Sequence, residues 1–194
     1  MKVVGINASH RRESNSGLML STALEICSAK GFEVEQIDLW DKEISYCVVC
    51  GLCGKKYGCS QDDDVMDILD KLAEADAILV ATPTYFGGIS GRLKSLFDRT
   101  LPLRRNKMML SGKIGAAFAV GGSRNGGQEY TIQQIHAWML IHEMAVVGDK
   151  KTAHFGGICT ARNAGDALKD EVGMQTVINT AENLCARLSS LARG

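Results

Sequence analysis

The sequence 77-AILVAT-82 is an uninterrupted apolar run, followed at once by 83-PTYFGG-88 and then by a helical pattern of Leu93, Leu96 and Phe97. A strand without polar alternation is typical of the centre of a parallel sheet, where helices cover both faces. Strand, small-residue turn and helix in that order form the repeating unit of such sheets. These residues therefore predict an α/β fold with residues 77–82 as a central strand.

The same unit recurs before and after this run. Further strands are expected at residues 2–8, 33–39, 113–121 and 144–148, whereas residues 149–163 resemble a loop. Five strands alternating with five helices predict an open, doubly wound parallel sheet with right-handed crossovers. In such sheets ligands bind beyond the carboxyl ends of the strands, so the loops there are the first candidates for a functional site.

The composition narrows the class of protein. The chain has 194 residues, which suits one domain, and its 22 Lys and Arg balance its 22 Asp and Glu. Nucleic-acid binding relies on a basic surplus, so the balance argues against a nucleic-acid partner. No run of 18 apolar residues and no signal-peptide pattern is present, so we expect no membrane span and a cytoplasmic location.

The loop after the first predicted strand carries several phosphate-binding side chains. They are Ser9, His10, Arg11, Ser14, Asn15 and Ser16, and a helical pattern begins directly after them. Free N–H groups and the dipole at a helix N-terminus favour an anion, so we expect a phosphate there. The motifs G-x-G-x-x-G and G-K-[ST] are both absent. A helix capped by Ser14 or Asn15 without any ligand is the alternative.

Two more loops at the same predicted edge suit a flat ligand. The first contains Pro83, Thr84, Tyr85, Phe86 and Gly87, and the second, 121-GGSRNGG-127, has four glycines in seven residues. Glycines at the end of a strand allow the backbone to approach a bulky group closely. A plain strand-to-helix turn is the alternative for the first loop.

The loop after the second strand contains four of the seven cysteines in a stretch of 13 residues: Cys47, Cys50, Cys53 and Cys59. A C-x2-C-x2-C turn supplies three ligands of a [4Fe-4S] cluster, and the next cysteine completes the set. Structural zinc usually takes two separated C-x2-C pairs, so zinc is a weaker interpretation, as are redox-active thiols without metal.

The remaining reactive and charged residues have ordinary interpretations. Cys27 and Cys185 fall on apolar helical stripes and are predicted core residues, while Cys159 stays undecided. His136, His142 and His154 show no metal spacing and are expected to be structural. Six basic residues are expected on a solvated or subunit-facing surface, with an acidic partner as a less favoured alternative: Arg92, Lys94, Arg99, Arg104, Arg105 and Lys107.

Together, the phosphate loop, residues 83–88 and residues 121–127 resemble the flavodoxin-like NADPH-dependent FMN reductases. With the compact cysteine motif, the whole chain resembles the iron-sulfur flavoproteins of anaerobic archaea and bacteria. This resemblance implies a flavodoxin-like, five-stranded parallel sheet of order 2-1-3-4-5. It also implies one FMN-binding domain over residues 1–194, with residues 40–62 as a [4Fe-4S]-binding insertion after strand 2.

The resemblance further implies the role of each site residue. The six residues between Ser9 and Ser16 named above would hold the FMN phosphate, and Pro83 to Gly87 would run along the flavin, with Gly121, Gly122 and Ser123 on its other side. Cys47, Cys50, Cys53 and Cys59 would hold the [4Fe-4S] cluster.

The function implied is that of an FMN-dependent oxidoreductase. A donor such as ferredoxin would reduce the cluster, and FMN would reduce a quinone, oxygen, peroxide or another redox protein. Family members are homodimers or larger, such as homotetramers, in which the cluster of one subunit faces the flavin of its neighbour. Two alternatives remain open: an NAD(P)H-dependent FMN or quinone reductase with a structural metal, and a non-enzymatic electron carrier or redox sensor.

Overall fold

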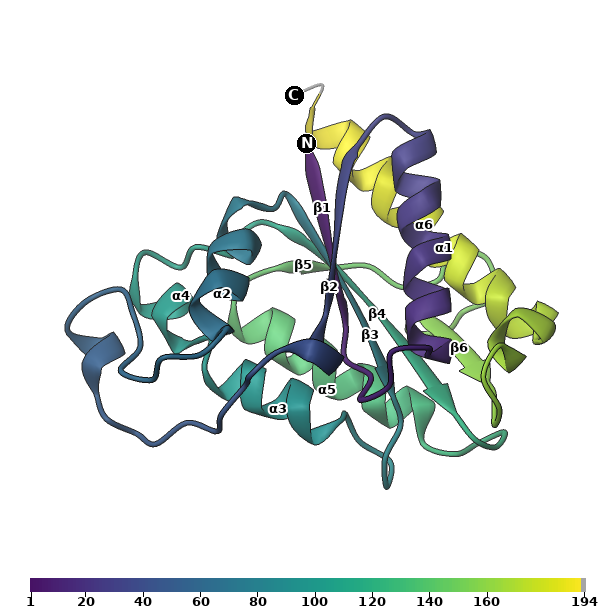
Figure 1. Ribbon diagram of the computed structural model, residues 1–194. Coiled ribbons are helices and arrows are strands. Elements are labelled where there is room, and N and C mark those ends of the chain that lie inside the picture. The colour runs from purple at the N-terminus through teal and green to yellow at the C-terminus, as the bar shows by residue number, and fades with distance from the viewer. Residues whose placement is uncertain (193–194) are drawn as a thin grey trace.

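The computed structural model describes residues 1–192, and its centre is a parallel β-sheet (Figure 1). The strand order is β2-β1-β3-β4-β5. The strands are β1 (Lys2–Asn7), β2 (Glu33–Asp38), β3 (Ala77–Pro83), β4 (Ile114–Gly121) and β5 (Ala145–Val146). β3 lies between β1 and β4, and its residues from Ala77 to Thr82 are buried. The predicted α/β class and the order 2-1-3-4-5 are therefore confirmed.

A further strand, β6 (Gly157–Thr160), extends the sheet, so the loop expected over residues 149–163 is wrong for these four residues. β5 pairs with the first two residues of β4, and β6 pairs with its last four. A Cβ atom on Gly157 would lie 2.4 Å from the Phe118 ring, so this glycine allows the close pairing but also hides the strand pattern in the sequence. The loop after β6 thus emerges beside the loop after β4.

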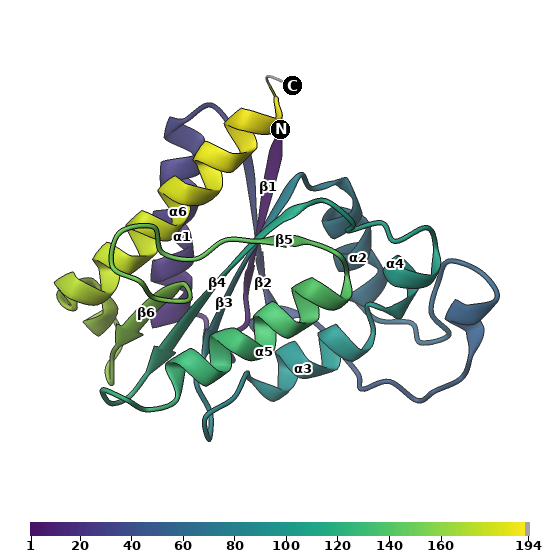
Figure 2. The same cartoon turned by 180° about the vertical axis from the view of Figure 1, so that it is seen from behind.

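Two helical layers cover the sheet (Figures 1 and 2). One layer holds α2 (Val65–Glu74), α3 (Gly91–Asp98), α4 (Leu101–Arg105) and α5 (Gln128–Ile141). The other holds α1 (Asn15–Ala29) and α6 (Glu171–Leu191). Short 3-10 turns occur at η1 (Leu39–Asp41), η2 (Leu52–Gly54) and η3 (Asp166–Lys169). Among residues 1–192, no helix is both long and apolar enough to cross a membrane.

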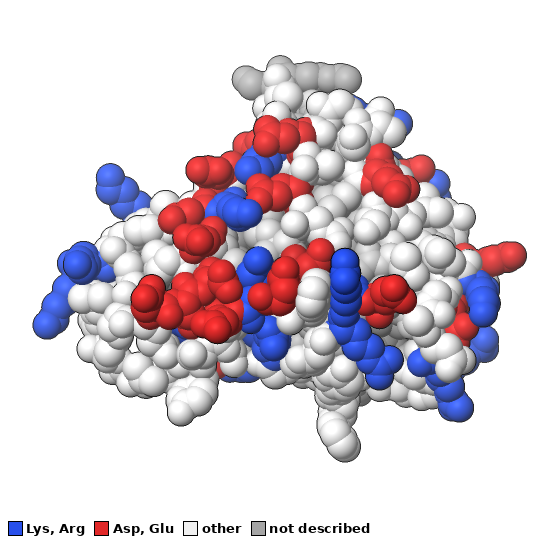
Figure 3. Space-filling view, in the orientation of Figure 1, with Lys and Arg blue, Asp and Glu red and all other residues white. Residues whose placement is uncertain are grey.

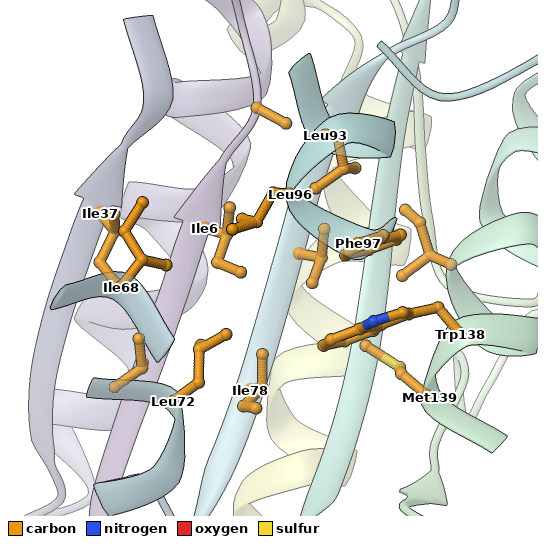
Figure 4. Close-up of a cluster of buried hydrophobic side chains, with 14 of the residues drawn as sticks. Ile6, Ile37, Ile68, Leu72, Ile78, Leu93, Leu96, Phe97, Trp138 and Met139 are labelled. Carbon is orange, nitrogen blue, oxygen red and sulfur yellow. The ribbon is translucent and has the colours of Figure 1, made fainter. Parts of the chain in front are cut away.

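Each layer buries its own apolar core. Under α2, α3 and α5, the rings of Phe97 and Trp138 stack with centroids 4.2 Å apart (Figure 4). Under α1 and α6, Cys27 and Cys185 are buried with their sulfur atoms 3.5 Å apart, which confirms both as core residues. Cys159, undecided from the sequence, is buried in the same core. The helices are therefore fixed by packing, and the loops at the sheet edge carry the exposed polar groups.

Candidate functional site

The loop between β1 and α1 is organised by the buried side chain of Asn7. Its Nδ2 donates to Asp38 Oδ1 at 2.7 Å, and its Oδ1 accepts from Ser16 Oγ at 2.9 Å. Ser14 caps α1 by accepting from Gly17 N at 3.1 Å. The N–H groups of Asn15 and Ser16 have no partner within the described chain, as is usual for a first helical turn. The loop therefore presents free donors at a helix N-terminus.

Most of the predicted phosphate residues line one cavity of about 280 Å³. Its lining includes Ser9, Arg11, Ser14, Asn15 and Ser16 from the first loop, together with Pro83, Thr84, Tyr85 and Gly122. His10 is exposed outside this lining, and its ring lies 5.8 Å from that of Tyr85. Three segments far apart in the sequence thus meet at one pocket.

Residues 85–88 form a tight hairpin beside this cavity. Tyr85 and Gly88 exchange two backbone hydrogen bonds, of 2.9 and 3.0 Å. Phe86 and Gly87 both have positive φ, of 50° and 74°, which is the pattern of a type I′ turn. This turn leaves the Phe86 side chain fully exposed. Phe86 and Gly87 therefore lie outside the cavity lining, at an exposed tip.

Of the three residues predicted to contact the flavin from the 121–127 segment, Gly122 lines the cavity, and Gly121 and Ser123 do not. Gly121 is buried against Gln128, whose Nε2 would lie 2.5 Å from a Cβ atom on Gly121. Ser123 is exposed, and its carbonyl oxygen accepts from Gln128 Nε2 at 2.8 Å. Gly121 and Ser123 therefore shape the loop from behind the cavity.

Sequence reasoning missed the residues that close the cavity on the β6 side. These are Ala161, Arg162 and Ala164. Arg162 Nε donates to the carbonyl oxygen of Gly122 at 2.7 Å, which ties the two loops together. Since residues 157–160 were expected to be a loop, nothing in the prediction placed residues 161–164 at the edge of the sheet.

The cysteine loop runs from η1 to α2 and projects from the sheet beside α2 and α4 (Figures 1 and 2). Its two ends pair with each other. Glu43 N donates to Asp64 Oδ2 at 2.6 Å, and Gln61 Nε2 donates to the carbonyl oxygen of Tyr46 at 3.0 Å. Glycines with positive φ, Gly51 at 78° and Gly58 at 143°, turn the chain between these ends. The loop is therefore a closed excursion without α-helix or strand.

All four predicted ligands, Cys47, Cys50, Cys53 and Cys59, line a second cavity of about 180 Å³. Within residues 1–192, no three His, Cys, Asp or Glu side chains converge where a single metal ion could bind. The Ser60 hydroxyl donates to Cys50 Sγ at 3.0 Å, and this bond, with that of the Leu52 backbone, lowers the pKa of the Cys50 thiol. The sulfur atoms thus surround a shared space rather than one point.

Two arginines of the α3 segment hold this loop, although both were expected on a solvated or subunit-facing surface. Arg92 Nη1 donates to the carbonyl oxygens of Leu39 and Lys42, at 2.5 and 2.6 Å. Arg99 is only 3% exposed, and its Nη2 donates to Cys59 Sγ at 3.2 Å. For Arg99 the surface prediction is therefore wrong, since the cysteine loop folds over it.

Comparisons with known proteins accord with this arrangement. The family model for NADPH-dependent FMN reductase matches residues 1–156. An iron-sulfur flavoprotein of Methanosarcina thermophila is 47% identical over 185 residues, covering 95% of this chain and 94% of that protein. The chain belongs to the iron-sulfur flavoprotein family. Family membership confirms the recognition made from the sequence and the assignment as an FMN-dependent oxidoreductase.

Another iron-sulfur flavoprotein, from Methanocaldococcus jannaschii, is also 47% identical and covers 95% of each chain. Among solved structures, a flavodoxin from the domain Archaea superposes with a TM-score of 0.58 at 22% identity, covering 95% of this chain and 99% of that one. At that identity the likeness shows the fold alone, and it confirms the flavodoxin-like architecture.

Proposed function

We propose that this iron-sulfur flavoprotein takes electrons from a one-electron donor such as ferredoxin at a [4Fe-4S] cluster and delivers them through FMN to a quinone, oxygen, peroxide or redox-protein acceptor. When bound, such a cluster supplies transfer of one electron at a time, and FMN supplies storage of one or two. The single observation that carries the proposal is the cavity lined by Cys47, Cys50, Cys53 and Cys59.

The donor set of this cavity fits a cluster better than a zinc ion. A structural zinc ion needs four ligands at about 2.3 Å from one point, and the four thiols do not converge in that way. A cubane spreads its four thiolates over four iron atoms and so suits a more open arrangement. Cys47, Cys50, Cys53 and Cys59 would hold it, with Arg99 and Ser60 donating to two of the sulfurs.

The cavity beside α1 fits the phosphate end of FMN. The free N–H groups of Asn15 and Ser16, the Ser9 and Ser14 hydroxyls and Arg11 are suitable donors for a phosphate. We assign FMN binding to the full predicted set: Ser9, His10, Arg11, Ser14, Asn15, Ser16, Pro83, Thr84, Tyr85, Phe86, Gly87, Gly121, Gly122 and Ser123. Arg162, which also lines the cavity, joins this set.

The two cavities have no lining residue in common, and the cysteine loop lies beside α2 and α4, away from α1 and α6 (Figure 1). About 280 Å³ is also at the lower limit for a ligand pocket, so one chain encloses a molecule of the size of FMN only in part. Both facts support a homodimer or homotetramer in which a neighbouring subunit completes the electron path. We retain residues 1–194 as one domain in a cytoplasmic protein, with residues 40–62 as the cluster insertion.

The surface near the cysteine cavity supports an acidic donor protein. Exposed cations there are Lys55, Lys56, Arg104, Arg105 and Lys107. Figure 3 shows basic side chains projecting at the end of the molecule where the cysteine loop lies, with a patch of acidic side chains next to them. Asp98, an acid of the cavity lining, is paired with Lys94 at 2.6 Å. A positive rim of this kind steers an acidic partner and raises its association rate.

The test is the Cys53→Ala variant, with Cys185→Ala as the matched control because Cys185 lies in the core under α6. We expect Cys53→Ala to lose iron and to lose reduction of FMN by reduced ferredoxin by at least tenfold, while FMN stays bound. Cys185→Ala should keep its iron and its rate of FMN reduction by ferredoxin. Unchanged ferredoxin-to-FMN transfer in Cys53→Ala would refute the proposed electron path.

A second candidate, direct reduction by NADPH, is favoured by the family model, which describes NADPH-dependent FMN reductases. In that case hydride would reach FMN directly and the metal would be structural. Stopped-flow mixing with NADPH under anaerobic conditions separates the two. Rapid bleaching of the flavin absorbance in Cys53→Ala as well as in wild type would favour this candidate.

A further inference from the structure

We infer that Arg99 is a positioning residue for the metal centre, which fixes Cys59 and favours the reduced state of the cluster through an N–H···S hydrogen bond. The inference rests on the proposed function and deepens it, since it names a residue that tunes the centre without ligating it. Arg99 lies just after α3, and the cysteine loop, more than 30 residues earlier in the chain, folds over it.

The guanidinium group of Arg99 contacts three parts of the loop. Nη2 donates to Cys59 Sγ at 3.2 Å, and Nη1 donates to the carbonyl oxygen of Ser45 at 3.2 Å and to the Asp63 carboxylate. The side chains of Arg99 and Asp63 are 1% and 4% exposed. The two ends of the loop are thus joined through one buried cation.

Burying this cation is costly, so the contacts must compensate for lost hydration. One carboxylate does so only in part, because Arg99 Nε is buried and has no hydrogen-bond partner among residues 1–192. The side chain nevertheless lines the cavity that the four cysteines surround. A cluster with four thiolate ligands is anionic and would place a further negative charge beside the guanidinium group. A negatively charged occupant of this cavity therefore suits the buried arginine.

The direction of the effect follows from charge. Reduction adds one electron to the cluster, so a donor to a ligand sulfur stabilises the reduced state more than the oxidised state, and hydrogen bonds to the sulfurs are known to set cluster potentials. Ser60 also donates to a cysteine sulfur but is exposed, so water can replace its hydrogen bond. Arg99 is buried, and nothing replaces its N–H group when the side chain is removed.

The planar fork of arginine matters as well as its charge. Arg99 reaches Asp63 with one nitrogen and Cys59 with another, whereas a lysine at this position has a single nitrogen on a flexible stem. Arg92, on α3 itself, holds only backbone oxygens at the start of the loop. Arg99 alone of these two combines loop anchoring with a contact to sulfur.

The experiment uses the anaerobically purified holoprotein and the variants Arg99→Met and Arg99→Lys. Lys30→Met is the matched control, since Lys30 is an exposed cation at the end of α1, in the other helical layer. Potentiometric titration followed by EPR gives the cluster midpoint, absorbance gives the flavin midpoint, and loss of iron to a chelator gives cluster retention. None of these readouts depends on turnover.

We expect Arg99→Met to have a lower cluster midpoint and at least tenfold faster iron loss, with an unchanged flavin midpoint. Arg99→Lys should show both changes to a smaller extent, and Lys30→Met should match wild type. A wild-type midpoint and wild-type iron retention in an Arg99→Met or Arg99→Lys protein that contains the cluster would overturn this inference and leave the proposed function intact. If Arg99→Met does not fold, the cluster midpoint and iron loss of Arg99→Lys test the inference in its place. Wild-type protein without iron and sulfide would instead overturn the proposed function.

Discussion

Gly127 lies so close to Gly87 that a Cβ atom on Gly127 would come within 2.7 Å of the Gly87 Cα atom. Gly127 is the N-cap residue of α5 and has a φ of 95°, and Gly87 lies in the exposed hairpin with a φ of 74°. The contact joins the loop after β3 to the loop after β4 by backbone alone. These are two of the loops assigned to the flavin, so their spacing depends on a residue without a side chain.

Replacing Gly127 by Ala should therefore separate the two loops. We expect a loss of about 1–3 kcal/mol in the free energy of unfolding and weaker FMN binding, because the methyl group adds a clash to an unfavourable φ. Gly31→Ala is the matched control, since Gly31 has a φ of 86° but no atom within 4 Å of the added Cβ. Denaturant titration and fluorescence titration with FMN measure both effects. Equal losses in the two variants would show that the loop contact is unimportant.

Asn7→Ala should loosen the loop before α1. The substitution removes the partner of Asp38, Ser14 and Ser16 inside the protein. Ser16 is buried, and leaving its hydroxyl unpaired costs about 1–3 kcal/mol in the free energy of unfolding. We also expect weaker FMN binding, measured by fluorescence quenching. Ser21→Ala, which removes an exposed hydrogen bond to Gln36, is the control. Wild-type FMN affinity in Asn7→Ala would mean that Asn7 supports stability only.

Acidification should destabilise the protein partly through His142, on the α5 side of the sheet. Burial, together with the charge of Arg104, lowers the pKa of His142 from 6.5 to about 4. Its Nε2 lies 2.9 Å from Thr100 Oγ1. Between pH 6.5 and about 4 the unfolded chain binds a proton at this residue that the folded chain does not, so stability falls as pH falls.

The expected contribution of His142 over this window is about 3 kcal/mol in the free energy of unfolding. Denaturant unfolding of wild type and His142→Gln at intervals between pH 7 and about 4 measures it. The difference in stability between the two proteins should narrow or reverse as pH falls. Parallel pH profiles would contradict the assignment.

The exposed cations near the cysteine cavity should affect the rate of electron transfer only when the donor is a charged protein. Lys55→Glu combined with Lys56→Glu should slow reduction by an acidic donor such as ferredoxin by about tenfold at low salt, and less at high salt, because salt screens exposed charges. Lys30→Glu combined with Lys150→Glu, which makes the same change in net charge at exposed positions outside the cysteine loop, is the control. Stopped-flow rates at two ionic strengths measure this. A rate that does not respond to the double substitution would place donor docking elsewhere.

The sequence was sufficient for the sheet because its buried strands are apolar without interruption, as in β3 and β4. The sequence was insufficient to predict that Arg99 is buried, because a basic side chain is usually exposed. Helical spacing held a usable signal: Arg92, Leu96 and Arg99 follow the i, i+4, i+7 pattern of one helix face. The residues after β6 were missed for another reason, since a four-residue strand that begins with glycine gives no clear alternation.

The most direct measurement is a quantified absorption spectrum of protein purified without air, with iron, sulfide, zinc and flavin determined per chain. A [4Fe-4S] cluster held by Cys47, Cys50, Cys53 and Cys59 together with one FMN predicts a brown-yellow protein containing about four iron, four sulfide and one flavin. A colourless protein that contains zinc and no flavin would contradict it.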